Sequence, residues 1–271
     1  MNNVIFDRRT ERGTVTSTRP GAVWSDWQGD HERWLFVSAH DDDIVFGAGL
    51  TLLAAIQKKI STYAAVFSNG EMGYCSFAHR GKIAEIRKAE TLESFRRLGM
   101  PRKHLYQFGF GDGCLFARAG RAWATEGDPN AIEGGTGLQN TMTWLLRQVC
   151  PTRIFLHNRA DIHPDHRAVH TDMVISIFHA QGTIWPELGK PIKKIPKLYE
   201  YATYSDFVTP PTMRTRVSPE IVEKRLNACA AFESQTQVEL ILDGLRRAGG
   251  NEYILEMEFD IIKPGKYDDI F

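Results

Sequence analysis

The sequence predicts an α/β fold in which helices flank a doubly wound, mostly parallel sheet. The first observation behind this is that short apolar runs, typical of strands covered on both faces, alternate with longer segments of helical periodicity. The second is that 271 residues, 42% of them hydrophobic, suffice for a large buried core. Alternating strands and helices are typical of parallel strands that are joined by helices.

The predicted elements follow one another in this alternating order. The predicted strands cover residues 34–39, 62–67, 105–108 and 153–156, with further strands near 198–203 and 253–259. The predicted helices cover residues 47–56, 82–98, 138–149 and 220–233, and one more follows position 166 and ends near 178. Turn residues support these ends, because Asn69 and Gly70 close the second apolar run, and Gly99 and Pro101 close the helix over 82–98.

The chain shows neither an internal repeat nor a linker that would separate two domains. One domain spanning residues 1–271 is therefore the simplest interpretation. Residues 1–33 have no clear period and are punctuated by polar residues, glycine and proline, so we interpret them as an N-terminal arm or edge segment.

Composition narrows the class of partner. Lysine and arginine number 33, as do aspartate and glutamate, so the net charge is zero and no global field would attract nucleic acid or an anionic membrane. The partner is expected to be a small, weakly charged molecule. The four cysteines lack CxxC spacing and are expected to be reduced thiols. The sequence contains neither the apolar stretch of a signal peptide nor a run of 18 apolar residues, so a cytoplasmic location is expected.

Two polar clusters follow predicted strands. His-Asp-Asp-Asp at 40–43 follows the strand over 34–39, and His-Pro-Asp-His at 163–166 comes shortly after the strand over 153–156. In an open parallel sheet, ligands bind beyond the carboxyl ends of the strands. Imidazole nitrogens and carboxylate oxygens are the ligands that suit zinc.

The number of ligands in these clusters matches a catalytic zinc site. A histidine and an aspartate from the first cluster and a histidine from the second would make the usual three protein ligands. One carboxylate would remain as a general base and one histidine as a donor to an oxyanion. Either cluster alone would be an ordinary turn or helix cap. The other histidines of this region, His157, His170 and His179, are interpreted as structural.

The same residues resemble a known family, the LmbE-like or PIG-L-type N-acetylglucosaminyl deacetylases. Positions 38–43 are similar to the AHPDD signature of that family, and positions 163–166 match its HPDH motif. Weaker likenesses follow in the expected order, to a TDG turn at 68–70, an R-x-x-E…LG helix at 87–99 and a K…SQ helix at 224–235. The resemblance implies a Rossmann-like fold and zinc-dependent hydrolysis of an N-acetyl amide.

The resemblance also implies roles for residues in the two clusters. His40, Asp43 and His166 would bind one Zn²⁺ ion per chain. Asp42 would act as the general base, and His163 would be the protonated donor that faces the oxyanion.

Further residues take supporting roles by the same resemblance. Asp165 would hydrogen-bond to His163 and raise its basicity, while Arg87 and Asp112 would contact sugar hydroxyls. Two positions depart from the family pattern, because Asp41 stands at the usual proline and Ile44 at the usual acid. Asp41 is expected to face away from the site and to matter least.

The sequence therefore predicts a zinc-dependent hydrolase that removes the N-acetyl group from an N-acetylglucosamine-type amino sugar or conjugate and releases acetate. The partner would be a small-molecule amino sugar, and the resemblance favours a homo-oligomer, either a trimer or a hexamer. Two alternatives stay open, a non-catalytic sugar-binding protein on the same fold and a metallophosphoesterase. A nucleotide-binding dehydrogenase is disfavoured, because no G-x-G-x-x-G follows the first predicted strand.

Overall fold

A nine-stranded mixed sheet forms the centre of the molecule. The computed structural model describes residues 4–128, 130–259, 261, 265–268 and 270. The strands of this sheet are β1 (Val4–Thr10), β2 (Gly13–Ser17), β3 (Arg33–Ser38), β4 (Ser61–Ser68), β5 (Leu105–Phe110), β8 (Arg153–His157), β9 (Lys197–Tyr201), β10 (Met213–Val217) and β11 (Asn251–Met257). They lie in the order β2-β1-β10-β11-β9-β8-β3-β4-β5, and β6 (Ala122–Trp123) and β7 (Gly135–Thr136) form a separate pair.

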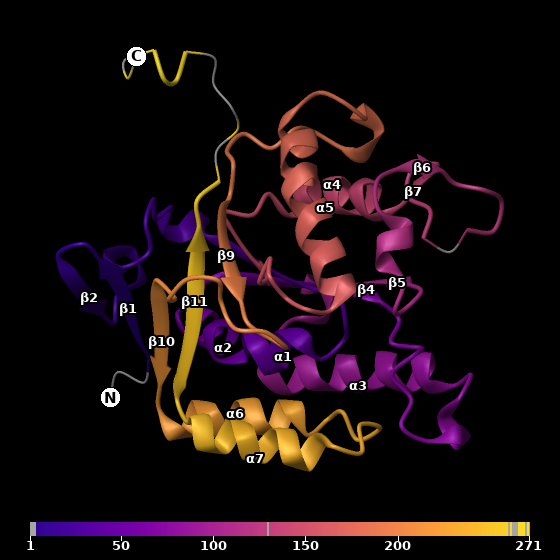
Figure 1. Ribbon diagram of the computed structural model, residues 1–271, viewed down its shortest axis with the longest axis horizontal. Coiled ribbons are helices and arrows are strands. Elements are labelled where there is room, and N and C mark those ends of the chain that lie inside the picture. The colour runs from indigo at the N-terminus through magenta and orange to yellow at the C-terminus, as the bar shows by residue number, and fades with distance from the viewer. Residues whose placement is uncertain (1–3, 129, 260, 262–264, 269, 271) are drawn as a thin grey trace.

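Helices cover both faces of this sheet. They are α1 (Asp43–Gly47), α2 (Gly49–Gln57), α3 (Ile83–Leu98), α4 (Leu138–Val149), α5 (Pro164–Gln181), α6 (Pro219–Cys229) and α7 (Val238–Ala248). In Figure 1, α4 and α5 lie on one side of the molecule, and α3, α6 and α7 lie on the other. The predicted α/β sheet flanked by helices is confirmed.

The strand β3 is buried on both faces. Trp34 and Phe36 pack in one hydrophobic cluster, whereas Leu35 and Val37 pack in a second one. Successive side chains of a strand point to opposite faces, so β3 contributes to both cores at once. Burial on both faces explains why this strand is a continuous apolar run in the sequence.

The parallel half of the sheet brings the ends of β3 and β8 together. β4 and β5 extend the sheet from one edge of β3, and β8 and β9 extend it from the other, all in parallel. The strand order therefore reverses between β3 and β8, and ligands bind outside the carboxyl ends of strands at such a point. The register pairs Phe36 with Phe155, so the segments that follow Ser38 and His157 leave the sheet side by side.

The other half of the sheet is antiparallel. β11 pairs with β9, β10 with β11, and β1 with both β10 and β2. Residues 1–33 thus supply two strands at the edge of the sheet, and the first three of these residues lie outside the described part.

β10 and α7 are not among the predicted elements. β10 escapes prediction because two of its five residues are arginines. In the structure, Asp7 of β1 accepts hydrogen bonds from both arginines and compensates their charge.

Among the residues that the structure describes, no helix is both long enough and apolar enough to cross a bilayer.

Candidate active site

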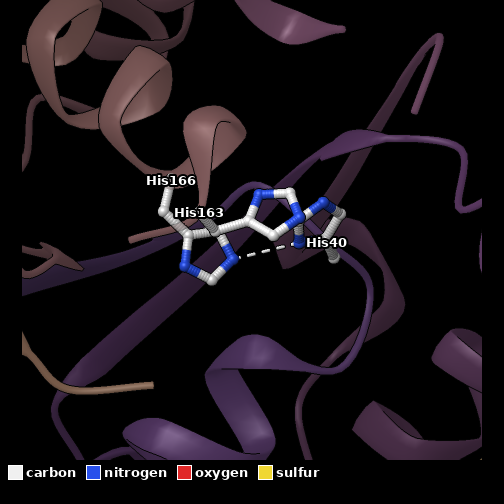
Figure 2. Close-up of side chains that lie close together, drawn as sticks. All are labelled: His40, His163 and His166. Carbon is white, nitrogen blue, oxygen red and sulfur yellow. Dashed lines mark hydrogen bonds between the residues drawn. The ribbon is translucent and has the colours of Figure 1, made fainter. Parts of the chain in front are cut away.

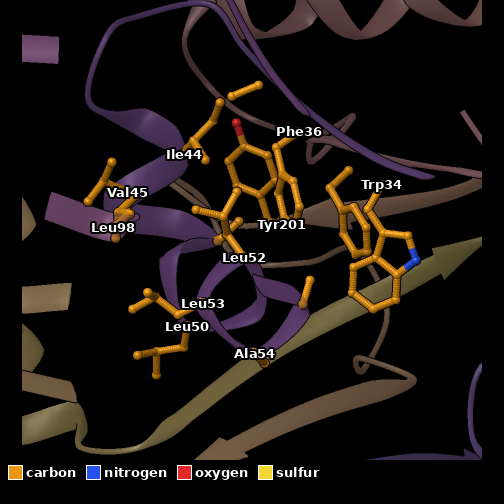
Figure 3. Packing of buried hydrophobic residues seen from close by; sticks show 14 of the residues in the cluster. Trp34, Phe36, Ile44, Val45, Leu50, Leu52, Leu53, Ala54, Leu98 and Tyr201 are labelled. Carbon is orange, nitrogen blue, oxygen red and sulfur yellow. The ribbon is translucent and has the colours of Figure 1, made fainter. Parts of the chain in front are cut away.

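The turn between β3 and α1 sets the position of the first polar cluster. The strand ends at Ser38 and α1 begins at Asp43. The carboxylate of Asp43 turns back along the chain, and its Oδ2 accepts a hydrogen bond of 2.8 Å from the backbone N–H of His40. Ile44 and Val45 follow directly and are fully buried in the core beside Tyr201 (Figure 3). Ile44, which stands at the usual acid of the family, is therefore a packing residue that anchors Asp43.

The second cluster lies on the first turn of α5. The loop after β8 is held by Asp161, whose Oδ1 accepts a hydrogen bond of 2.9 Å from the N–H of His163. His163 precedes the helix, and its Nδ1 accepts from the N–H of Asp165 at 3.2 Å. His166 follows on the same turn, and its ring points toward the end of β3.

Three side chains from the two clusters converge on one point. His40 Nδ1 lies 3.0 Å from His166 Nε2 and 3.3 Å from Asp43 Oδ2. His166 Nε2 lies 3.3 Å from the same Asp43 oxygen. Figure 2 shows the rings of His40 and His166 facing each other across the first of these distances, with His163 beside them.

This spacing fits a tetrahedral metal ion. Ligand atoms that each lie about 2.0–2.1 Å from zinc are about 3.3–3.4 Å from one another in a tetrahedron. The three distances between His40, Asp43 and His166 are 3.0, 3.3 and 3.3 Å. In the described part, three overlapping groups of histidine and aspartate could hold a metal ion, and each of them contains His40 or His166: His40, His163 and His166; Asp43, His157 and His166; and His40, Asp112 and Asp165. These residues form a candidate His/Asp metal site.

Each of these two histidines also turns its second ring nitrogen toward a carboxylate. His166 Nδ1 lies 3.3 Å from Asp161 Oδ2, and Asp161 is buried. His40 Nε2 lies 3.2 Å from Asp112 Oδ1 and 3.5 Å from Asp165 Oδ2. A carboxylate on the second nitrogen orients the ring and is typical of metal-ligating histidines. Sequence reasoning gave Asp161 no role, and its place just before the His-Pro-Asp-His run was the available signal.

The charge around the cluster favours a cation. Burial by itself raises the pKa of Asp43, but the charges of His166 and His40 outweigh it and hold the pKa well below its usual range. Burial lowers the pKa of His166, while Asp43 and Asp161 raise it to about 9. The surrounding carboxylates thus stabilise positive charge at this point, whether it is carried by protons or by a metal ion.

Asp42 lies beside the cluster in a different environment. Burial and the charges of Asp41 and Asp43 raise the pKa of Asp42 to about 8, although Arg87 opposes them. Gln235 Nε2 donates a hydrogen bond to Asp42 Oδ2. A carboxylate with a raised pKa is suited to accepting a proton near neutral pH.

Asp41 does not face away from the site, so that expectation is wrong. Its side chain is buried, and Arg87 Nη1 donates a hydrogen bond of 3.5 Å to its Oδ2. Arg87 is also buried, lies 3.7 Å from Asp42 Oδ2 and donates to the carbonyl oxygen of Gly73. The guanidinium explains why the buried Asp41 can lie next to the partly buried Asp42, because it compensates their charge.

Asp165 does not hydrogen-bond to the ring of His163 through its carboxylate, which corrects a second expectation. Its two oxygens accept hydrogen bonds of 2.8 Å from the backbone N–H groups of Gly113 and Leu115. These groups lie in the loop that follows β5, far from Asp165 in sequence, so only the tertiary structure brings them to it. Burial and the charges of His40 and His166 lower the pKa of His163, although Asp165 opposes them.

His157 belongs to the surroundings of the cluster. It ends β8, and its ring stacks on that of His166 with centroids 3.7 Å apart and planes 11° apart. Its Nε2 accepts a hydrogen bond of 2.9 Å from the N–H of Ala39. Burial and the charge of His166 lower the pKa of His157 to about 4, so the ring is neutral. Of the histidines interpreted as structural, His157 supports the ring of His166. His170 pairs instead with Glu200, and its Nε2 lies 3.1 Å from Glu200 Oε1.

A cavity of about 620 Å³ opens onto these residues. Six predicted site residues line it, namely His40, Asp42, Asp43, Arg87, Asp112 and His163. His166 and Asp165 are fully buried behind this surface. The structure thus brings six of the eight predicted site residues to the lining of a single cavity, and the other two, His166 and Asp165, lie within 3.5 Å of His40.

Several known proteins resemble this chain. Residues 35–177, more than half of the chain, match the family described as PIG-L: GlcNAc-PI de-N-acetylase. No curated protein sequence matches significantly. Among solved structures, the conserved protein TT1542 from Thermus thermophilus is 25% identical, with a TM-score of 0.64 over 85% of this chain and 97% of that one.

Two further solved structures share the fold at lower identity. N,N′-diacetylchitobiose deacetylase from Pyrococcus horikoshii is 21% identical, with a TM-score of 0.68 over 91% of this chain and 92% of that one. GalB, the 4-carboxy-2-hydroxymuconate hydratase from Pseudomonas putida, is 16% identical, with a TM-score of 0.62 over 86% and 98%. The second of these is not a deacetylase, so the fold alone does not settle the reaction. The family match and the His/Asp cluster within it lead to one conclusion: the chain belongs to the PIG-L family.

Proposed function

We propose that this protein is a zinc-dependent hydrolase that removes the N-acetyl group from an N-acetylglucosamine-type amino sugar or conjugate and releases acetate. The observation that carries the proposal is the convergence of His40, Asp43 and His166 within 3.3 Å of one another at the floor of a cavity. Membership of a de-N-acetylase family and the fold shared with a chitobiose deacetylase support it.

His40, Asp43 and His166 would hold the zinc ion. When bound there, zinc supplies Lewis acidity toward the acyl carbonyl and lowers the pKa of the attacking water. Asp42 then accepts the proton of that water. Gln235 holds one carboxylate oxygen of Asp42 through a hydrogen bond, which leaves the other oxygen to act as the base.

His163 is proposed to stabilise the oxyanion as a neutral donor. The N–H of Asp165 donates to His163 Nδ1, so the proton of a neutral ring lies on Nε2. The lowered pKa of His163 favours this neutral form. His163 also lines the cavity, where an N–H donor can reach a developing negative charge. This revises the expectation that His163 is protonated. Because His163 lies at the N-terminus of α5, its Nδ1 accepts the N–H of Asp165, and a protonated ring has no lone pair on Nδ1 with which to accept it.

Arg87 and Asp112 are proposed to contact the sugar. Both line the same cavity as Asp42 and His163. Asp112 would do so while it also orients His40, from which its Oδ1 lies 3.2 Å away.

The trimer or hexamer stays a prediction, to be checked by light scattering.

The test combines metal analysis with an assay for acetate. Protein purified without chelator should hold about one zinc ion per chain, and acetate release from N-acetylglucosamine or its dimer should stop with chelator and return with zinc. His166→Ala should lose the metal. His163→Ala should keep it and lose about 10²–10³-fold in kcat, the usual cost of removing one oxyanion donor.

Other outcomes would overturn the proposal in distinct ways. A fully active protein without metal would exclude the zinc mechanism. Phosphate release with two bound ions would favour the metallophosphoesterase. Sugar binding without turnover in the zinc-loaded protein would favour the non-catalytic alternative.

A further inference from the structure

One face of α3 carries polar residues that are buried. Four residues on this face are at most 9% exposed, namely Arg87, Glu90, Thr91 and Ser94. Residues three, four and seven positions apart lie on the same side of a helix. A buried polar group costs free energy unless it is hydrogen-bonded or paired. Thr91 bonds within the helix, to the carbonyl oxygen of Arg87, whereas Arg87 and Glu90 bond to other parts of the chain.

The carboxylate of Glu90 holds the segment between α6 and α7. Its Oε1 accepts a hydrogen bond of 2.7 Å from the backbone N–H of Ser234, and its Oε2 accepts one of 2.7 Å from the hydroxyl group of the same residue. Ser234 lies 144 positions from Glu90 and is 5% exposed. Because residues 230–237 lie between the two helices, the N–H of Ser234 has a side chain as its partner instead of a helical carbonyl group. Two bonds from one carboxylate fix both the position and the orientation of Ser234.

Ser234 is followed directly by Gln235, the residue that contacts Asp42. Gln235 Nε2 donates to Asp42 Oδ2, and Gln235 itself is buried. On the other side of Ser234, Phe232 is fully buried in the core. The backbone that carries Gln235 is therefore held by Phe232 and by the two bonds to Glu90. A displacement of Ser234 would move the amide group that holds Asp42.

α3 thus reaches Asp42 by two routes. Arg87 Nη1 lies 3.7 Å from Asp42 Oδ2 directly, and Glu90 reaches the same oxygen through Ser234 and Gln235. Glu90 Oε2 also lies 3.9 Å from Arg87 Nε. A change at Glu90 can therefore reach the site through Gln235 or through Arg87. Because Arg87 is proposed to bind substrate and Gln235 to hold the base, the two routes have different kinetic consequences.

We propose that Glu90 is a positioning residue for Asp42 and that it acts through Ser234 and Gln235. This inference rests on the proposed function, in which Asp42 is the general base. A base must lie within hydrogen-bond reach of the proton that it takes, and a displacement of about 1 Å can cost about 10²-fold in rate. Loss of Glu90 should lower kcat and leave KM and zinc binding unchanged, because Glu90 neither lines the cavity nor belongs to the metal cluster.

The experiment compares variants of Glu90 in the zinc-loaded protein by acetate release from N-acetylglucosamine or its dimer. Glu90→Ala should lower kcat about 10–100-fold, with KM and zinc content near wild type. Glu90→Gln should keep most of the wild-type kcat, because its amide can still accept the N–H of Ser234 and can donate to the hydroxyl oxygen. Ser234→Ala removes only one of the two bonds, so it should lower kcat less than Glu90→Ala does. This milder variant tests the same link if Glu90→Ala does not fold.

Glu32→Ala is the matched control for the loss of a buried carboxylate. Glu32 is 2% exposed and accepts hydrogen bonds from Trp34 at 2.9 Å and from Arg153 at 3.1 Å. It precedes β3, whereas the metal cluster follows the other end of that strand. Its replacement should lower the melting temperature and leave kcat unchanged. A loss of kcat in Glu32→Ala equal to that in Glu90→Ala would reduce the effect of Glu90 to general destabilisation and overturn the proposal.

A double variant identifies the route. If Glu90 acts through Gln235, Glu90→Ala combined with Gln235→Ala should have the kcat of Gln235→Ala alone, because both changes break one chain of contacts. Losses that multiply in the double variant would make Glu90 independent of Gln235. A raised KM with unchanged kcat in Glu90→Ala would assign Glu90 to Arg87 instead. Either of these last two results would overturn the proposal.

The NMR signals of the Gln235 side-chain amide separate this inference from the proposed function. Their assignment follows from their absence in Gln235→Ala. If no acetate is released by the wild-type protein, the proposed function fails, but Glu90→Ala should still shift these signals as Asp42→Ala does, and Glu90→Gln and Glu32→Ala should not. Wild-type signals together with wild-type kcat in Glu90→Ala would overturn the positioning role and leave the proposed deacetylase standing.

Discussion

Replacing Asp161 with asparagine tests how the proposed metal site holds His166. Asp161 is 1% exposed, and its Oδ2 lies 3.3 Å from His166 Nδ1 and accepts from the N–H of Tyr204 at 3.2 Å. Its Oδ1 accepts from the N–H of His163 at 2.9 Å. The carboxylate thus faces only donors. Burial by itself raises the pKa of Asp161, but the neighbouring His166 and hydrogen bonds from the backbone outweigh it and lower the pKa to about 2, so the group is ionised over the working range.

Asparagine keeps the size of the side chain but turns one of the two oxygens into a donor. A donor would then face a donor at His166 and Tyr204 or at His163, and the ring of His166 would lose its fixed orientation. Loss of such a partner weakens metal binding about 10–100-fold, which corresponds to about 1.4–2.7 kcal/mol. Asp161→Asn should therefore bind zinc less tightly by this factor, as measured by competition with a chromophoric chelator.

Asp172→Asn provides the matched control for Asp161→Asn. Asp172 is also a buried carboxylate, lies on α5 with His166, and accepts a hydrogen bond of 3.0 Å from the N–H of Gly120. Its replacement should lower the melting temperature of the protein but leave zinc affinity unchanged. Wild-type zinc affinity in a folded Asp161→Asn protein would refute the argument that Asp161 orients His166.

Three further predictions follow from the same site and from the edge of the sheet. Asp42→Asn should retain zinc by elemental analysis but lose at least about 10²-fold in kcat, because an amide cannot accept the proton; near wild-type turnover would remove Asp42 from the mechanism. Arg87→Ala should raise KM more than it lowers kcat if Arg87 binds substrate uniformly, and unchanged steady-state kinetics would assign it to charge compensation alone. Asp7→Asn concerns stability: burial alone raises the pKa of Asp7, but hydrogen bonds from Arg216 and two other donors outweigh it and hold the pKa below its usual range. A lowered pKa stabilises the fold above the unfolded value of about 4 and ceases to do so as the pH falls further. Urea unfolding should show a cost of about 1–3 kcal/mol near pH 7 that shrinks below about pH 4, and a cost that does not change with pH would contradict the ion-pair explanation.

The amino-acid sequence was enough to place the two polar clusters at the carboxyl ends of strands. Buried parallel strands must be apolar on both faces, so the run over 34–39 was readable as a strand, and the polar residues after it had to leave the sheet at its carboxyl edge. The same reasoning placed His163 and His166 after the strand over 153–156. Both statements depend on local patterns, and for that reason they did not require knowledge of the topology.

Only the tertiary structure decided what surrounds those groups. Asp161 at His166, Asp165 at the loop after β5 and Gln235 at Asp42 are contacts whose partners come from different loops and helices, and their geometry depends on how those segments pack. Asp41 was expected outside the site because local turn geometry says nothing about Arg87, which arrives from α3. The antiparallel half was hidden for a related reason, because the two arginines of β10 are compensated by Asp7 of β1, which lies about 200 positions away in the sequence.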